Sequence, residues 1–363
     1  MDMGDIFKSF CIFGDFISAA PYGSGHINDT YAVVCSQAGL KVRYIFQRIN
    51  HNIFKNPQAL MSNIARVTEH CRSRLGASDQ DASRKTLTLV KANDGKDYFI
   101  DDEGSYWRCY LFIENAVTYD VPETNEQIFQ AAQAFGSFQN LVSDLGGEPL
   151  NETIPDFHNG PKRYKTLLEA IETDSVNRAA SAKSEIDKIV ALSPVFDVLP
   201  ALVEAGKIPV RITHNDTKIN NVMIDNETDK GICVIDLDTV MPGLALYDFG
   251  DMVRTTASPT AEDEKDLSKV GLRQDRFEAV LRGYLSTAGA FLNDAEKDNL
   301  ILSGKMITLM IGVRFLTDYL SGDTYFKTKY PEHNIDRCRT QIKLVESIIE
   351  QEDQLQALLG SII

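Results

Sequence analysis

Three polar residues in the middle of the chain have the types and spacing that ATP-dependent phosphoryl transfer requires. In the segment HNDTKINN (214–221), Asp216 is followed five positions later by Asn221, and the apolar segment ICVI then leads directly into Asp236. An acid in the first position can accept a proton from a substrate hydroxyl. An amide and a second acid offer the oxygen ligands that Mg²⁺ prefers. We therefore predict Asp216 as the catalytic base and Asn221 and Asp236 as the metal ligands.

Each of these residues also has an ordinary structural interpretation. Asp and Asn are common in loops, where they form turns and cap helices, and Asp236 by itself only ends a strand. The sequence between them reads as a strand over 222–224, a turn over 225–231 and a strand over 232–235. The three residues together with this strand–turn–strand pattern favour the functional interpretation.

The residues before this segment predict a β-rich N-terminal region. Apolar positions at helical spacing predict a helix over 56–75. Enrichment in β-branched and aromatic residues predicts five strands, over residues 30–35, 42–49, 87–90, 98–100 and 106–113. We expect a five-stranded sheet with one inserted helix.

From about residue 125 the periodicity becomes helical. It predicts helices over 126–145, 165–180 and 184–192, and again from 262 to 356. The fold class is therefore α+β, with two lobes, a β-rich N-terminal lobe and a mainly helical C-terminal lobe. We place the lobes at residues 1–115 and 116–363, with a hinge at about 111–118 and ATP in the cleft between them.

Composition excludes several classes of function. The chain has 363 residues and a net charge of −15, which argues against nucleic acid and anionic membrane surfaces as partners. The six cysteines form no CxxC pair, as expected for reduced thiols in a cytoplasmic protein. No signal peptide or membrane span is expected, and the most apolar run, 306–316, is short and contains Arg314. We expect a monomer or a small homo-oligomer.

The motifs HNDTKINNVMID and VIDLDTVMPGLALYDFGDMVR resemble those of the aminoglycoside phosphotransferase and choline kinase superfamily. More narrowly, PYGSGHINDTY, RFLTDYLSGDTYF and TKYPEHN resemble segments of the N-acetylhexosamine 1-kinases, and the likeness covers nearly the whole chain. The resemblance implies a protein-kinase-like fold. It also implies ATP- and Mg²⁺-dependent phosphorylation of the anomeric hydroxyl of N-acetylglucosamine and N-acetylgalactosamine.

The glycine-rich segment before the first predicted strand is a candidate phosphate loop. Gly23 and Gly25, on either side of Ser24, let backbone amides approach the phosphates of ATP. Protein kinases place a lysine on the third strand for the same phosphates. Here Gln47 or Arg48 occupies that place, and strand alternation allows only one of them to face the nucleotide.

Further residues are candidates for the adenine and for the metal-binding loop. We expect the apolar side chains of Ile113 and Ile235 to enclose the adenine ring. Asp238 is either an outer metal partner or a plain loop acid. Asp248 begins a DFG motif but follows Asp216 too late to match the metal position, and we expect it to hydrogen-bond backbone amides and so hold the catalytic loop.

Arg314 interrupts an apolar helical segment, so its charge requires a partner or a cleft. It either forms an ion pair with Asp318 or hydrogen-bonds the hydroxyls of a sugar, with Tyr325 from the next loop beside it. In the family resembled, matching Arg and Tyr positions line the sugar site, and the resemblance adds His26 and Asn215 to that site.

Other functions remain open at this point. Another small-molecule kinase of the superfamily would act on choline, homoserine, methylthioribose or an aminoglycoside, and a cationic acceptor would require acids or aromatic cages. A kinase-like protein that binds nucleotide without turnover is disfavoured by the intact set of Asp216, Asn221 and Asp236.

Overall fold

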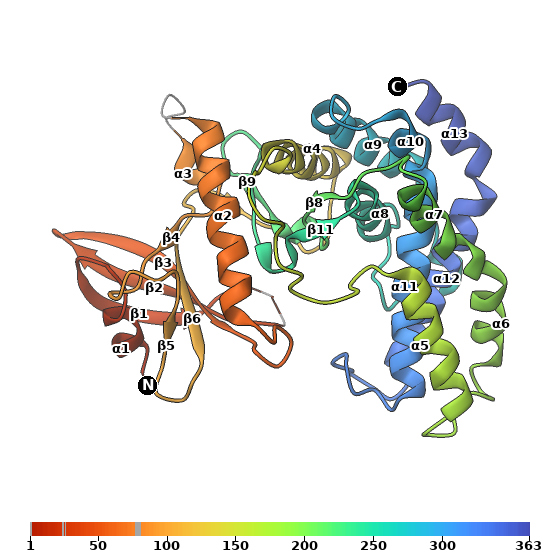
Figure 1. The fold of residues 1–363 in the computed structure, drawn as a ribbon, viewed down its shortest axis with the longest axis horizontal. Coiled ribbons are helices and arrows are strands. Elements are labelled where there is room, and N and C mark those ends of the chain that lie inside the picture. The colour runs from red at the N-terminus through yellow and green to blue at the C-terminus, as the bar shows by residue number, and fades with distance from the viewer. Residues whose placement is uncertain (1, 24, 26, 77–80) are drawn as a thin grey trace. The chain divides into compact units, whose positions relative to one another are not determined.

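The computed structural model describes residues 2–23, 25, 27–76 and 81–363, which form two compact units (Figure 1). The first unit consists of Met1–Asp120, Leu141–Pro155 and Asn221–Pro242, and the second of Val121–Asn140, Asp156–Asn220 and Gly243–Ile363. Strands prevail early in the chain and helices later, so the predicted α+β class is confirmed. The predicted division at residue 115 stays a prediction.

An antiparallel sheet forms the body of the first unit. Among the described residues it has six strands, in the order β1-β2-β3-β6-β4 with β5 paired to β6. The strands are β1 (Asp15–Pro21), β2 (Asp29–Gln37), β3 (Leu40–Ile49), β4 (Leu89–Val90), β5 (Phe99–Ile100) and β6 (Tyr106–Leu111). The helices of this part of the chain are α1 (Met3–Lys8), α2 (Pro57–Leu75) and α3 (Ala82–Lys85).

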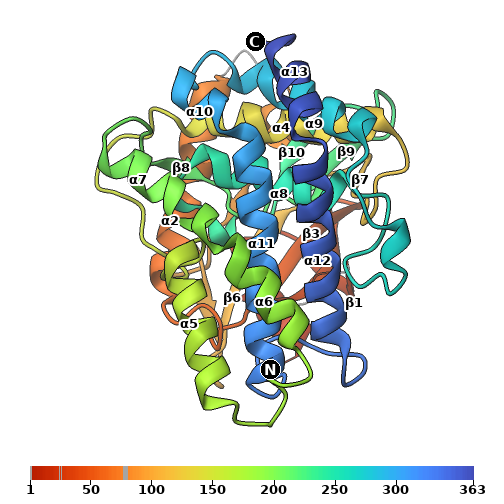
Figure 2. The same cartoon turned by 90° about the vertical axis from the view of Figure 1, so that its right-hand side faces the viewer.

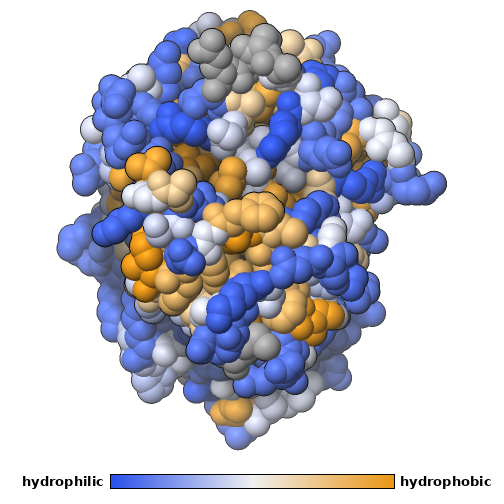
Figure 3. Space-filling model, turned by 90° about the vertical axis from the view of Figure 1, so that its left-hand side faces the viewer, coloured by the Kyte–Doolittle hydropathy of each residue, from blue (hydrophilic) through white to orange (hydrophobic). Residues whose placement is uncertain are grey.

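The sequence analysis predicted five of these strands and missed β1. In β1 most residues are exposed or half-buried, because it is an edge strand that pairs only with β2. It therefore lacks the apolar alternation by which a half-buried strand is recognised. Ile17 of β1 and Leu40 of β3 are among the exposed apolar residues of the first unit. Figure 3 shows the face of the molecule that lies on the left in Figure 1, where apolar side chains are exposed among polar ones.

The two faces of the sheet have different compositions. On one face, Val33, Phe46 and Cys109 are fully buried against Phe7 and Phe10 from the N-terminal segment. The other face has polar side chains at neighbouring positions, described below with the site. Strand alternation therefore separates an apolar core from a polar row within the same three strands.

In a second, smaller sheet, the predicted metal ligands Asn221 and Asp236 lie just before and just after a pair of strands. This sheet has the order β10-β9-β7 and comprises β7 (Ala116–Val117), β9 (Val222–Asp225) and β10 (Gly231–Val234). Strands β9 and β10 form an antiparallel hairpin in which Val234 pairs with Val222. This confirms the predicted strand–turn–strand arrangement.

Helices dominate the second unit. They are α4 (Asn125–Val142), α5 (Gly160–Thr173), α6 (Lys183–Leu192), α7 (Val198–Glu204), α8 (Ala245–Thr256), α9 (Gln274–Ala288), α10 (Asp294–Asp298), α11 (Leu300–Leu320), α12 (His333–Glu350) and α13 (Glu352–Gly360). Two short strands, β8 (Arg211–Thr213) and β11 (Met241–Gly243), pair with each other. Figure 2 shows α11 beside α5 and α12, both of which it contacts.

The helices differ from the sequence-based prediction at several places. Helix α7 was not predicted, and the stretch predicted as helical from 262 to 356 is divided by loops into α9, α10, α11, α12 and α13. Helix α5 begins at Gly160 rather than at 165, because the side chain of Asn159 caps the amide of Lys162 and a proline occupies the first turn. It ends at Thr173 because Asp174 adopts a left-handed conformation, with φ of 38°. No helix was predicted over α8, whose sequence contains the DFG motif.

Helix α11 is largely buried within the second unit. By length and composition alone, Leu300–Leu320 is apolar enough to cross a membrane, but 78% of its most apolar 18-residue window is buried inside the protein. Gly250 of α8 lies against it, and a Cβ there would stand 2.8 Å from Cγ1 of Ile307. The apolar character of α11 is therefore that of a core helix of this unit.

Candidate active site

The predicted catalytic loop, residues 214–220, follows β8 in the second unit and is held by the carboxylate of Asp248. The amide of His214 donates to Asp248 Oδ2 at 2.9 Å, and the amide of Asn215 donates to Oδ1 at 2.6 Å. Gln139 of α4 donates to the same carboxylate at 2.6 Å. Burial raises the pKa of Asp248, although these donors and His214 act in the opposite direction. The role predicted for Asp248 is confirmed.

Asp216 presents a carboxylate that is ionised at neutral pH. Its side chain is 23% exposed, and Lys218 Nζ lies 2.9 Å from Oδ1. Burial alone would raise the pKa of Asp216, but the positive charge of Lys218, with smaller effects from His214 and Arg254, lowers it below its ordinary value. An ionised acid beside a cation is suited to orient a hydroxyl and to accept its proton.

Helix α8 fixes the loop at a second point. The amide of Thr217 donates to Asp251 Oδ2 at 2.9 Å, and the Thr217 hydroxyl donates to the carbonyl of Asp248 at 2.6 Å. Asp251 is itself bonded to Arg254 Nε at 2.8 Å, and both side chains are almost fully buried. Helix α8 thus supplies two carboxylates, Asp248 and Asp251, that accept from the backbone amides of residues 214, 215 and 217.

His158 also supports the predicted catalytic loop, through a hydrogen bond to its backbone. Its Nε2–H donates to the carbonyl of Asn215 at 2.9 Å, and Nδ1 is buried without a hydrogen-bond partner among the described residues. Burial lowers the pKa of His158 to about 4, with Asp216 raising it and Arg314 lowering it. The imidazole is therefore neutral at physiological pH, and both charges act on its ring.

Asn221 and Asp236, the predicted metal ligands, are brought together by the β9–β10 hairpin in the first unit. The amide of Ile235 donates to the carbonyl of Asn221 at 2.9 Å, directly beyond the Val234–Val222 pair. Asp236 is exposed and left-handed, with φ of 59°. No cluster of three or more His, Cys, Asp or Glu side chains suited to a metal occurs among the described residues. One amide and one carboxylate oxygen fit Mg²⁺ that takes its remaining ligands from phosphates and water.

A row of polar side chains crosses the sheet of the first unit. Thr30, Gln47 and Arg108 are partners in register on β2, β3 and β6. Gln47 Nε2 donates to Thr30 Oγ1 at 2.9 Å, and Arg108 Nε donates to Gln47 Oε1 at 2.9 Å. Arg108 also forms an ion pair with Asp238, which accepts from Asn28 Nδ2 at 2.6 Å. Asp238, two residues after Asp236, thereby anchors to the sheet the loop that contains this predicted metal ligand.

In the polar row, β3 contributes the uncharged Gln47, and the positive charge comes from Arg108 on the neighbouring strand β6. Arg108 is 1% exposed, and burial alone would lower its pKa, but the Asp238 carboxylate raises it above the ordinary value. Arg48 lies on the opposite face from Gln47, where its Nε donates to Asp29 at 2.9 Å. Of the two alternatives, only Gln47 faces the row that leads to the metal-binding loop.

The remaining nucleotide candidates also lie in the first unit. Gly23 has φ of 81°, and a Cβ at Gly23 or Gly25 would meet no atom within 4 Å, so the loop backbone is open to a ligand there. Ile113 is buried and Ile235 is half-buried. Ser24 and His26 lie outside the described residues, and their roles stay predictions.

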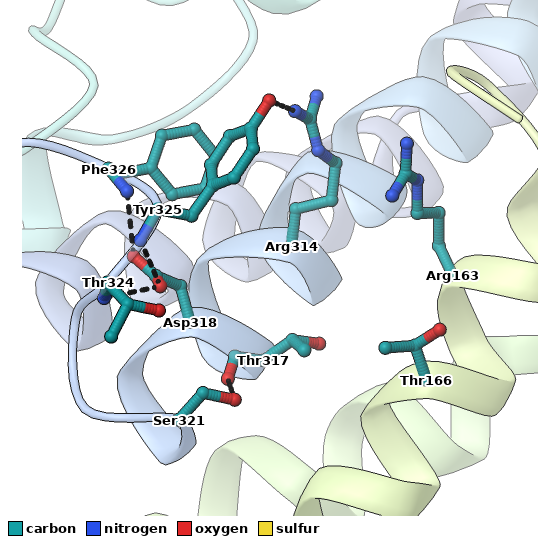
Figure 4. Close-up of a pocket in the computed structure, with 9 residues that line it drawn as sticks. All are labelled: Arg163, Thr166, Arg314, Thr317, Asp318, Ser321, Thr324, Tyr325 and Phe326. Atoms are coloured by element: carbon teal, nitrogen blue, oxygen red, sulfur yellow. Dashed lines mark hydrogen bonds between the residues drawn. The ribbon is translucent and has the colours of Figure 1, made fainter. Parts of the chain in front are cut away.

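Arg314 and Tyr325 line one cavity of about 200 Å³ in the second unit (Figure 4). Arg314 Nη2 donates to the Tyr325 hydroxyl at 3.3 Å. The predicted alternative, an ion pair with Asp318, is wrong. The carboxylate of Asp318 instead accepts from the backbone amides of residues 324, 325 and 326 at 2.8–2.9 Å.

Several residues of the site were not predicted. Arg108 carried a usable signal, because a charge inside the apolar strand YWRCYL requires a partner just as Arg314 does. Lys218 stands inside the catalytic segment itself. His158 and Arg163, which also lines the cavity, lie in segments without a distinctive pattern, so only the tertiary structure identifies them.

Comparison with known proteins finds one matching family model and several solved structures with a similar fold. A model of the phosphotransferase enzyme family (APH) matches residues 18–284. The AMP-bound complex of spectinomycin phosphotransferase, APH(9)-Ia, has a TM-score of 0.58 at 12% identity, covering 95% of this chain and 96% of that one. An aminoglycoside phosphotransferase from Alicyclobacillus acidocaldarius gives 0.55 at 13%, covering 94% and 91%. Choline kinase from Cryptosporidium parvum gives 0.54 at 13%, covering 95% and 92%. These likenesses show a protein-kinase-like fold.

Proposed function

This chain belongs to the phosphotransferase enzyme family, and from that membership we propose that it is an ATP- and Mg²⁺-dependent kinase that phosphorylates the anomeric (C1) hydroxyl of N-acetylhexosamines. The products would be sugar 1-phosphates of N-acetylglucosamine or N-acetylgalactosamine. We also propose that it acts in the cytoplasm as a monomer or small homo-oligomer, in line with its six free cysteines.

The observation that carries the proposed acceptor is the charge of the cavity around Arg314. Its lining includes two arginines, Arg163 and Arg314, and a single acid, Asp318, whose carboxylate is occupied by backbone amides. A cationic acceptor such as choline or an aminoglycoside would meet two guanidinium groups and no available carboxylate. A neutral sugar, in contrast, offers carbonyl and hydroxyl oxygens to both arginines.

The proposed chemistry assigns a role to each of the predicted catalytic and metal-binding residues. The Asp216 carboxylate accepts a hydrogen bond from the C1 hydroxyl and orients it. As the C1 oxygen bonds to the γ-phosphorus of ATP, the bond from that phosphorus to the bridging oxygen breaks, ADP leaves and Asp216 takes up the hydroxyl proton. Asn221 and Asp236 would hold Mg²⁺, which when bound neutralises charge on the triphosphate. Arg108 and Asp238 keep the metal-binding loop in place, and Asp248 and Asp251 do the same for the loop of Asp216.

The decisive experiment is a substrate panel with Mg-ATP. Purified protein is incubated with N-acetylglucosamine, N-acetylgalactosamine, glucose, choline, homoserine, methylthioribose and kanamycin. ADP release is followed, and ³¹P NMR locates the transferred phosphate. We expect an anomeric phosphate on an N-acetylhexosamine. Replacing a general base lowers turnover by about 10²–10⁴-fold, so Asp216→Asn should fall in this range.

A matched control is Asp187→Asn, an exposed acid of α6 that is paired only with Lys183 and should leave turnover unchanged. Turnover of the amines alone would overturn the assignment of the acceptor while preserving the role of Asp216. Nucleotide binding without turnover of any compound would indicate a kinase-like binding protein.

A further inference from the structure

The cavity beside Arg314 has a second arginine, Arg163, and a neutral sugar would leave the charges of both arginines unneutralised. Arg163 projects from α5 and Arg314 from α11, and Figure 4 shows both guanidinium groups on the same side of the cavity. The cavity is open to solvent through Tyr325, which is 59% exposed. A ligand therefore has access to both arginines.

Neither arginine has a carboxylate partner within 4 Å in the part of the chain that the structure describes. Asp318 is the only acid among the lining residues, and it is fully engaged. Besides the three amides of the following loop, it accepts from Asn334 Nδ2 at 2.9 Å. Two arginines without a carboxylate partner therefore line one cavity, although the chain has 52 acidic residues against 37 basic ones.

The guanidinium of Arg163 is incompletely hydrogen-bonded. Its Nη2 donates to the carbonyl of Phe157 at 3.4 Å, and its buried Nε has no partner among the described residues. Burial, and then the charge of Arg314, lower the pKa of Arg163. An anion that pairs with this guanidinium would neutralise a charge that burial and the neighbouring Arg314 both disfavour.

Arg314 is held in place by aromatic rings and by a phenol. Its guanidinium carbon lies 5.2 Å from the ring centre of Phe157, 5.6 Å from that of Tyr325 and 5.5 Å from that of Phe326. The rings restrict its side chain without neutralising its charge. It is therefore positioned to donate several hydrogen bonds to a ligand.

Three of the hydroxyl groups that line the cavity have the opposite preference. The hydroxyls of Thr166, Thr317 and Ser321 donate to the carbonyls of residues 162, 313 and 317 at 3.0, 2.8 and 2.8 Å. Their hydrogens are thus used within the helices, and the oxygens can only accept from a ligand. The cavity has a cationic donor end and a neutral acceptor end.

We propose that Arg163 and Arg314 form an oxyanion subsite, and that the cavity binds a polyhydroxylated ligand that carries a phosphate or carboxylate group. Arginine pairs suit this role because each guanidinium can donate two parallel hydrogen bonds to such a group. The anion comes either with the sugar itself or as free phosphate. The inference rests on the proposed function only in identifying the acceptor end of the cavity with the sugar.

Isothermal titration calorimetry without ATP or metal tests the subsite directly. The probes are inorganic phosphate, N-acetylglucosamine and N-acetylglucosamine 6-phosphate, and the proteins are wild type, Arg163→Gln, Arg163→Lys and Arg273→Gln. Arg273 is an exposed arginine of the same unit, bonded to Asp275, and serves as the matched control. We expect the phosphorylated sugar to bind at least about tenfold more tightly than the neutral sugar, since one charge-assisted hydrogen bond contributes about 1.5–3 kcal/mol.

This preference should disappear in Arg163→Gln, persist in part in Arg163→Lys and remain whole in Arg273→Gln. Tight binding of inorganic phosphate would identify a free anion as the ligand, whereas weak binding of phosphate alone would place the anion on the sugar. Equal affinity for both sugars, or equal losses in Arg163→Gln and Arg273→Gln, overturns the subsite. Failure of the kinase assay with the anion preference intact would refute the proposed function and not the subsite.

Discussion

Two regions of the molecule handle buried positive charge in opposite ways. In the first unit, Arg108 is 1% exposed and forms an ion pair with Asp238, whose side chain is 3% exposed. In the second unit, Arg163 and Arg314 line a cavity in which Asp318, the only acid among the described lining residues, is occupied by backbone amides. Arg108 is satisfied by the protein itself, and the other two are left for a ligand.

The difference separates a residue that maintains the architecture from residues that recognise a ligand. A buried charge with its own partner contributes to the folded state, and removing the partner leaves an uncompensated charge. A half-buried charge without a partner is unfavourable in the empty protein and gains when a ligand arrives. The comparison can be sharpened by measuring stability and binding in the same variants.

The largest effect is expected for Arg108→Met. This change leaves the buried Asp238 carboxylate without its cation, and breaking a buried pair in this way costs about 3–5 kcal/mol. Urea unfolding at neutral pH measures the loss. The double variant with Asp238→Asn should recover more than half of it, and a single-variant loss below about 1 kcal/mol would show that the pair does not stabilise the fold.

A change of pH should produce the next largest effect through His158. Burial lowers its pKa from 6.5 to about 4, so between these values the unfolded chain binds a proton that the native protein does not. Stability from this group is complete above about pH 6.5 and falls as the pH decreases toward about 4, by about 3 kcal/mol in total and about 2 kcal/mol at pH 5.

Unfolding of wild type and His158→Gln at about pH 7 and pH 5 checks this expectation. Glutamine preserves an amide N–H for the carbonyl of Asn215 and does not titrate in this range. The variant should lose less stability than wild type between the two conditions. Parallel losses would refute the assignment of the titration to His158.

Arg163→Gln and Arg314→Gln should each change the free energy of unfolding by no more than about 1 kcal/mol, because neither variant breaks an ion pair. Arg163→Gln is expected to be neutral or slightly stabilising, since it removes an unsatisfied buried donor and repulsion from Arg314. The same urea experiment applies. A loss as large as that of Arg108→Met would erase the distinction between the two regions.

The smallest effect is expected for Arg48→Ala. Its pair with Asp29 is about half exposed on both sides, and exposed pairs contribute about 0.2–1 kcal/mol. The loss should shrink further when salt is added. A loss above about 2 kcal/mol would mean that Arg48 has a partner beyond this surface pair.

The sequence predicted the β9–β10 hairpin because its signal is local, and the catalytic and metal-binding roles of the residues around it stay predictions. Asp216, Asn221 and the strand before Asp236 stand within a short stretch, and the hairpin that joins the last two is also local. Asp248 followed from its motif and its distance along the chain. The edge strand β1 was missed because it buries too little apolar surface to produce a pattern.

Residues that act across long sequence separations were harder to predict. The pairing of Arg108 with Asp238 depends on the register of three strands, which no window of sequence reports. For Arg314, the sequence correctly indicated the need for a cleft or partner but allowed the wrong partner, Asp318. That acid was already required by the amides of a loop whose conformation the sequence does not specify.

The attachment of this loop has a consequence for how the protein can diversify. Residues 324–326 are held to α11 through their backbone amides, which every residue type except proline possesses. Their side chains, Tyr325 among them, are therefore free to be exchanged while the loop keeps its course. Natural variation or directed evolution can alter what the cavity accepts at these three positions, provided that Asp318 is retained.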